Sequence, residues 1–142
     1  KAFPIIRKEL DVMMKRVDDF APFHEISPDQ LYISNDDKWK MFFLKAGTVK
    51  FKKNCKQFPK TIKVLEKDKN IVSAYFSVLG PNKMLMPDNN RVVLFLDYMR
   101  PLPKFWSFIN WCIVKSARLI PYFRTPIKRH KIWEKEFYKD YG

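Results

Sequence analysis

The chain has 142 residues, of which 46% are hydrophobic and 16% aromatic, and its 28 Lys and Arg against 15 Asp and Glu give a formal net charge of +13. This length and apolar content predict a packed globular domain, and no apolar run reaches the roughly 18 residues of a membrane-spanning helix. The charge favours polyanionic partners such as nucleic acid, anionic lipid or phosphorylated glycolipid. Nucleic acid is the least favoured, because the sequence has neither zinc-finger spacing nor an RNP signature.

The first 37 residues predict a helix followed by a loop. Helical spacing puts the apolar residues of positions 3–20 on one face, and such a methionine-rich stripe is typical of a helix packed on a core. Pro22 and Pro28 indicate a loop over positions 21–37. The stripe consists of Ile5, Ile6, Leu10, Met13, Met14 and Val17.

The middle of the chain predicts strands, because short runs of β-branched and aromatic residues lie between turn-forming residues. Positions 39–44 and 48–52 form a predicted hairpin through Lys45-Ala46-Gly47. Pro59 suits the first turn of a short helix that ends near Glu66. Positions 71–79 form the next strand, and Gly80-Pro81-Asn82 turns the chain after it.

The segment 91–101 carries an arginine, five apolar residues and an aspartate ahead of a proline. So short an apolar run predicts a strand buried on both faces. Side chains alternate along a strand, so one face is shared by Arg91, Val93, Phe95 and Asp97. A guanidinium at the mouth of an apolar strand needs an anion, because an unpaired buried charge is costly. That anion is either a carboxylate of the protein or the carboxylate of a bound ligand.

The last 38 residues predict a helix over positions 105–120 and then a basic, aromatic end. Two interpretations are open. The helix either packs over the domain, or lies in a membrane interface with aromatic side chains at the acyl boundary and cations on anionic head groups. The relevant cations are Lys115, Arg118, Arg124, Lys128, Arg129 and Lys131.

Five segments, taken in order, resemble the aspartyl/asparaginyl β-hydroxylase family, which includes bacterial lipid A hydroxylases. Each segment is weakly specific alone, but the ordered set is specific, and the resemblance covers about positions 3–103. The segments are Trp39-Lys-Met-Phe-Phe-Leu with Gly47, Asn54-Cys55-Lys-Gln-Phe-Pro59-Lys60-Thr61, Phe76-Ser77-Val-Leu-Gly-Pro81, Arg91-Val-Val-Leu-Phe-Leu-Asp97 and Arg100-Pro101-Leu102.

The resemblance implies a double-stranded β-helix, or jelly roll, mainly β with flanking helices, over residues 1–104. The residues after it, 105–142, are predicted from their own pattern to form a helical, basic and aromatic tail. It also implies an enzyme that uses Fe(II), 2-oxoglutarate and molecular oxygen to hydroxylate an unactivated C–H bond. In such an enzyme 2-oxoglutarate becomes succinate. The substrate would be a lipid A-like acyl chain, which charge and tail favour, or a peptidyl Asp or Asn.

The resemblance assigns the cosubstrate carboxylates to Ser77 and Arg91, which names the anion that Arg91 needs. A small polar residue such as Ser77 also commonly satisfies a neighbouring backbone group. Trp39 would shape the substrate pocket, although core packing is the ordinary role of a tryptophan.

The iron site departs from the family pattern. The family carries a histidine just after the proline of the Ser77 segment, and a second one before the last strand. Here positions 84–87 run directly into 88–91, and the sequence's two histidines, His24 and His130, lack that context and predict surface or packing roles. Either the chain lacks the iron-bearing block, or residues are missing between Pro87 and Asp88. We favour the second, because a barrel without its middle strands exposes sheet edges.

The cysteines bear on the compartment. Relatives that act on disulfide-rich substrates pair two cysteines around the Pro59 segment, but Ile62 stands where the partner of Cys55 would be. Free Cys55 and Cys112 fit a reducing compartment. We therefore expect a cytoplasmic protein, peripheral to the inner face of a membrane. The alternative function is a non-catalytic basic module that binds membrane or nucleic acid.

Overall fold

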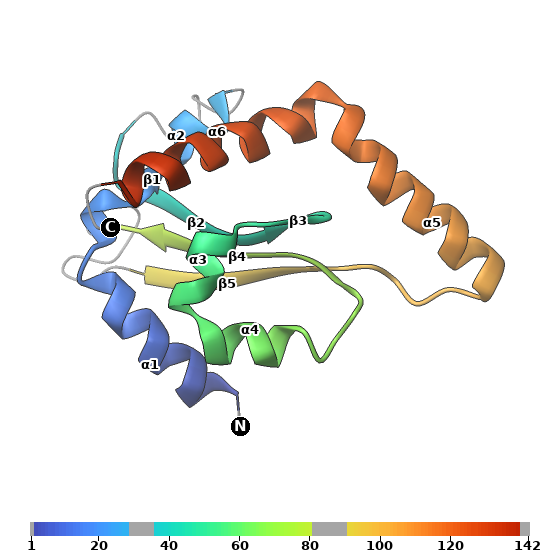
Figure 1. The fold of residues 1–142 in the computed structure, drawn as a ribbon, viewed down its shortest axis with the longest axis horizontal. Helices are drawn as coiled ribbons and strands as arrows, with labels where there is room; N and C mark the ends of the chain where they lie inside the picture. The colour runs from blue at the N-terminus through green and yellow to red at the C-terminus, as the bar shows by residue number, and fades with distance from the viewer. Residues whose placement is uncertain (1, 29–35, 81–90, 140–142) are drawn as a thin grey trace.

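The computed structural model describes residues 2–28, 36–80 and 91–139. A five-stranded antiparallel sheet lies at the centre, with helices on both sides (Figure 1). The strand order is β1-β2-β4-β5, and β3 pairs with β2 as well. The fold is therefore a mixed α/β fold. The strands are β1 (Ala21–Pro22), β2 (Trp39–Ala46), β3 (Val49–Lys50), β4 (Ile71–Leu79) and β5 (Arg91–Tyr98).

The described residues form this one sheet, and a jelly roll needs a second sheet packed face to face with the first. The jelly roll therefore stays a prediction. The junction between Pro87 and Asp88 lies outside the described residues, as does most of the turn expected at Gly80.

One face of the sheet is closed by α1 (Phe3–Met14) and α4 (Pro59–Leu65) (Figure 1). The predicted stripe packs here through Leu10 and Met13, whereas Ile5 is exposed. Glu9 joins the two helices, since its carboxylate accepts hydrogen bonds from the Lys60 and Thr61 N–H groups at 2.9 and 2.8 Å and from the Thr61 hydroxyl at 2.7 Å. Burial opposes ionisation of Glu9, but these hydrogen bonds outweigh it and lower its pKa.

The opposite face is covered by α6 (Pro121–Phe137) and the short α2 (Phe23–Ile26). His130 of α6 is fully buried. Its Nε2 accepts a hydrogen bond from the Phe43 N–H at 3.2 Å, and the Asn54 amide of α3 (Lys52–Gln57) donates to the Phe43 carbonyl at 2.8 Å. Phe43 lies between the stretches of β2 that pair with β1 and with β3. The two side chains thus complete the hydrogen bonding of this strand where a backbone partner is missing.

Strand β5 differs from the prediction, because it is not buried on both faces. Among the described residues it is the last strand in the order and pairs with β4 alone. Val92, Leu94 and Leu96 pack toward the α1 and α4 layer, but on the other face Phe95 remains 44% exposed. Burial on both faces would require a covering layer over the second face as well.

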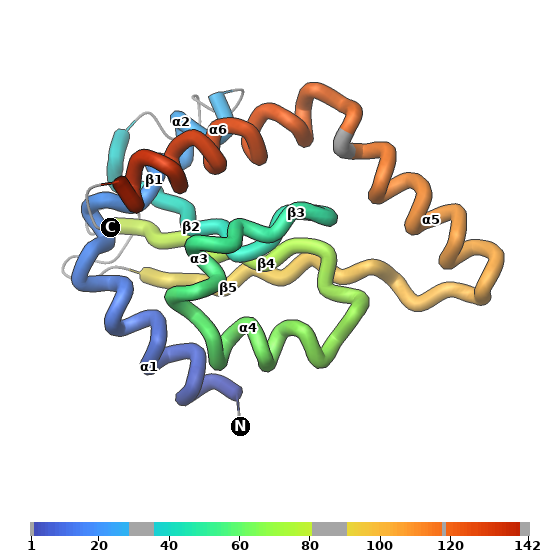
Figure 2. Tube along the Cα trace, viewed as in Figure 1, coloured from blue at the N-terminus to red at the C-terminus, as the bar shows by residue number. Residues whose placement is uncertain are grey.

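The C-terminal segment forms two helices of different character. The expected helix is found as α5 (Lys104–Ser116), followed by the 3₁₀ turn η3 (Ala117–Leu119). Figure 2 shows that α5 extends away from the sheet and meets α6 at an angle, so the two form an arch. Because α6 shares the core of the preceding sheet, the division between residues 104 and 105 stays a prediction.

Candidate functional site

Trp39 and Ser77, predicted as site residues from distant parts of the sequence, lie side by side on β2 and β4. The Trp39 indole N–H donates a hydrogen bond of 2.8 Å to the Ser77 hydroxyl. The Trp39 ring in turn stacks on Phe23 of α2, with ring centroids 4.0 Å apart and an interplanar angle of 12°. Ser77 is 8% exposed. Its oxygen is therefore held by the indole, while its hydrogen has no acceptor among the described residues and remains available to a ligand.

Arg91 begins the neighbouring strand on the same face of the sheet. Leu79 is the register partner of both Trp39 and Arg91, and Ser77 is opposite Val93. Ser77 and Arg91 are therefore diagonal neighbours, which lie about 7–8 Å apart in antiparallel sheets. Arg91 is exposed and has no hydrogen-bond or ion-pair partner in the ranges that the structure describes. We call Trp39, Ser77 and Arg91 the sheet corner.

A cavity of about 640 Å³ lies on the same face, between the sheet and the α5–α6 arch. Met41, the register partner of Ser77, lines it, and so does Phe23, which stacks on Trp39. The cavity therefore adjoins the sheet corner. Further lining from the sheet side comes from Phe43, Phe51 and Tyr75, and lining from the arch comes from Ile113, Val114, Ala117, Ile120, Phe123 and Ile127.

Few polar groups face this cavity. Among the described residues that line the cavity, Asp97 alone is charged. Ser73, the register partner of Asp97, lies beside it. Tyr75 stacks on Phe95 at 5.3 Å. Burial, and secondarily the negative charge of Asp97, raises the pKa of the Tyr75 phenol. Tyr75 is therefore a neutral group at neutral pH, which leaves Asp97 as the charged side chain that lines the cavity within the described residues.

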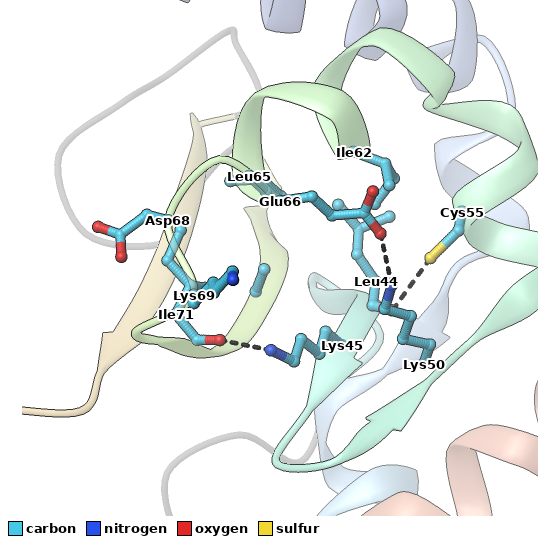
Figure 3. A pocket seen from close by; sticks show the side chains of 11 residues that line it. Leu44, Lys45, Lys50, Cys55, Ile62, Leu65, Glu66, Asp68, Lys69 and Ile71 are labelled. Atoms are coloured by element: carbon cyan, nitrogen blue, oxygen red, sulfur yellow. Dashed lines mark hydrogen bonds and ion pairs between the residues drawn. The ribbon is translucent and has the colours of Figure 1, made fainter. Parts of the chain in front are cut away.

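A smaller cavity of about 250 Å³ lies beside α4 (Figure 3). Its polar groups satisfy one another: Lys45 donates to the Ile71 carbonyl, Lys50 pairs with Glu66, and the Cys55 thiol donates to the Leu44 carbonyl at 3.3 Å. Burial raises the pKa of Cys55 to about 11, so the thiol stays protonated and unreactive. These pairings occupy the buried polar groups of the lining, and we interpret this cavity as structural.

The described residues do not fit an iron site. No group of three or more His, Cys, Asp or Glu side chains in residues 2–28, 36–80 and 91–139 is placed to hold a metal. Nε2 of His130 already accepts the Phe43 N–H, and burial lowers the pKa of His130 to about 3. His24 lies 3.9 Å from the Asp37 carboxylate, in a pair rather than a ligand set.

Comparison with known proteins agrees with the resemblance seen in the sequence. Residues 1–89 match the aspartyl/asparaginyl beta-hydroxylase family. The chain belongs to this family. It is also 27% identical to the ornithine lipid ester-linked acyl 2-hydroxylase of Rhizobium tropici, over 99% of this chain and 69% of that protein. No solved structure matches the chain.

The alignment with the Rhizobium protein covers 195 positions, more than the 142 residues of this chain. It must therefore include positions where the relative has residues and this chain has none.

Sequence reasoning named the three residues that the structure brings together at the sheet corner, and it predicted a helical tail, but it did not separate α6 from α5 and gave no sign of the cavity. The signal for α6 was present: Pro121 suits a first helical turn, and apolar or aromatic side chains recur at helical spacing after it, at Phe123, Ile127, His130, Trp133 and Phe137. The cavity has no comparable signal, because its lining comes from five separate stretches of the chain, near positions 23–27, 41–51, 72–75, 97 and 113–127.

Proposed function

We propose that this protein is a 2-oxoglutarate- and Fe(II)-dependent hydroxylase that acts on an acyl chain of a membrane lipid. The observation that carries the proposal is the sheet corner. A buried hydroxyl and a guanidinium, neither of which donates to a partner among the described residues, lie on one face of adjacent strands. Such donors suit the carboxylate of a small cosubstrate. Membership of a hydroxylase family supports the same interpretation.

In this proposal each corner residue has a distinct role. Arg91 pairs with the distal carboxylate of 2-oxoglutarate, Ser77 donates its hydroxyl hydrogen to that carboxylate, and Trp39 fixes the Ser77 oxygen by its 2.8 Å hydrogen bond. Because the described residues lack an iron site, we assign no step through the metal to them. Its ligands would come from the block that the resemblance places before Arg91, and the complete jelly roll would include that block.

A lipid substrate is favoured over a peptidyl Asp or Asn by the surface of the arch. Every residue of α5 is at least partly exposed, and its exposed surface is rich in aromatic rings: Phe105 is 67% exposed, Trp106 57% and Phe108 62%. The sequence contains no Asp or Glu between Asp97 and Glu134. Exposed aromatic rings with only basic residues among them are typical of a surface that binds an anionic bilayer.

The Rhizobium relative acts on an acyl chain of a lipid, as its name states. No helix in the described part of the chain is long and apolar enough to cross a membrane. We therefore propose peripheral binding, at the cytoplasmic face of an inner membrane, with α5 in the interface. Nucleic acid is not part of this proposal.

The test is succinate formation by the purified protein, supplied with Fe(II), 2-oxoglutarate, oxygen and vesicles of anionic lipid. We expect turnover in the wild type and its loss in Arg91→Ala, because the cosubstrate loses its charged partner. Arg7→Ala is the matched control, since Arg7 is an exposed arginine on α1, paired only with Asp11 of the same helix. Turnover that survives in Arg91→Ala would contradict the role given to this residue.

A second candidate function is a non-catalytic membrane-binding module. It is favoured by one observation, the missing ligand set for iron in the described ranges. The intact mass of the protein purified from its own cells separates the two. A mass well above 17.2 kDa, with the added peptides mapping between Pro87 and Asp88, supports the hydroxylase. A mass of 17.2 kDa together with an inactive wild type supports the module.

A further inference from the structure

The cavity beneath the arch is a second feature that the sheet corner does not explain. Its volume of about 640 Å³ falls within the roughly 300–1,000 Å³ of ordinary small-molecule sites. Met41 is 6% exposed and Phe51 1%, so its sheet wall is firmly packed. Its arch wall is open to solvent, since Ile113 is 59% exposed and Phe123 50%.

The lining determines the chemistry of the occupant. Apart from Asp97, the charged side chains in the described ranges all lie elsewhere, and Tyr75 is neutral because burial raises its pKa. A ligand rich in charges or hydrogen-bonding groups would lose its hydration here without finding partners. An unbranched hydrocarbon chain loses no hydrogen bonds on entering and gains from burial of its methylene groups.

The position of the cavity selects a membrane lipid as the source of that chain. At one end Met41 and Phe23 connect it to Ser77 and Trp39. At the other, Ile113, Ile120 and Phe123 both line it and belong to the exposed apolar surface of the arch. An apolar path therefore runs from the surface that would lie on a bilayer to the corner that would hold the cosubstrate.

We propose that this cavity holds one acyl chain of an ester-linked membrane lipid, which enters through the arch and lies along the sheet toward Ser77. The inference rests on the proposed function for the identity of the substrate, and it adds where the chain is bound. The arch is then the wall of the substrate site as well as the membrane-binding surface.

The experiment measures binding without turnover. The full chain is titrated, without iron or 2-oxoglutarate, with a lysophosphatidylcholine whose acyl chain carries a terminal pyrene, below its micelle-forming concentration. Ala117 lines the cavity from η3, and we expect Ala117→Trp to weaken binding by about tenfold or more because the indole fills the space. Ala2→Trp, at the start of α1 on the opposite side of the sheet, is the matched control and should bind as the wild type does.

Val114→Trp, which fills the cavity from α5, is a second variant in case the first fails to fold. Wild-type affinity in both folded variants would overturn the inference, even if Arg91-dependent succinate formation upheld the proposed function. Conversely, weakened binding in the cavity variants without succinate from any protein would support the acyl-chain site and refute the hydroxylase.

Discussion

Helices α5 and α6 follow one another in the chain and are both rich in aromatic and basic residues, yet they behave differently. In α6 the side chains of His130 and Phe137 are 0% and 6% exposed, and Glu134 accepts hydrogen bonds from the Lys53 and Asn54 N–H groups of α3 at 3.0 and 3.1 Å. In α5 the large apolar side chains lie mostly in solvent. Two helices of similar composition thus differ in role. Aromatic side chains of α6 pack in the core, whereas those of α5 stay exposed and available to a binding partner.

This difference between the two helices indicates the role of the exposed aromatic side chains of α5. The domain buries aromatic side chains of α6 but leaves those of α5, which extends away from the sheet, uncovered. Exposed apolar surface of this kind typically marks an interaction site. The comparison predicts that substitutions in α6 change stability, whereas those in α5 change binding.

The largest effect is expected at His130. His130→Ala removes the acceptor of the Phe43 N–H and of the Asn54 amide, which lies 3.2 Å from Nε2, and leaves a space in the core. Unsatisfied buried donors and a core void together cost about 4 kcal/mol, measurable by urea unfolding. A loss below about 1 kcal/mol would mean that α6 is not part of the cooperative core.

The pH dependence of stability also tests whether His130 of α6 belongs to the folded core. Burial lowers the pKa of His130 in the folded protein to about 3, so the unfolded chain binds a proton more readily, near the ordinary histidine value of about 6.5. Stability from this group is complete above about pH 6.5 and is lost as pH falls toward 3, by about 1.4 kcal/mol per pH unit. His130→Gln should have a shallower slope than the wild type over this range. Equal slopes would show that His130 protonates without unfolding α6.

The smallest effect on stability is expected in α5. Phe108 is 62% exposed, so Phe108→Ser should change the free energy of unfolding by no more than about 0.5 kcal/mol. Its affinity for anionic vesicles should fall by about tenfold, since burial of an aromatic side chain contributes about 1.5–3 kcal/mol. Phe3→Ser on α1, which replaces a phenylalanine 73% exposed, is the matched control and should keep its vesicle affinity. Equal losses in the two variants would remove α5 from the membrane-binding proposal.

Local sequence signals accounted for most elements. Strand β4 has the predicted bounds, Ile71–Leu79, because an apolar and aromatic run is flanked by Asn70 and Gly80, residues that favour turns. The hairpin turn at Gly47 adopts a positive φ of 58°, which glycine adopts without strain. Positions 21–37 were expected as a loop, and the two short elements β1 and α2 in that range were missed.

The local sequence signals predicted the burial of β5 incorrectly. The apolar run of β5 has the composition of a central strand, but its place at the edge of the sheet depends on which strands pair with it. The sequence contains no local sign that β5 has one neighbour instead of two within the described part of the sheet.

The sequence by itself determined the family and most strands and helices, and it supplied the prediction of Trp39, Ser77 and Arg91 as site residues, because motif order and side-chain periodicity are encoded in short stretches. Only the tertiary structure decided that Trp39 donates a hydrogen bond to Ser77 and that a cavity lies under the arch. It also decided that His130 accepts a hydrogen bond from Phe43 of β2, 87 residues away in the chain. Those features depend on contacts between segments far apart in the chain, and the packing of the whole core determines which of these contacts form.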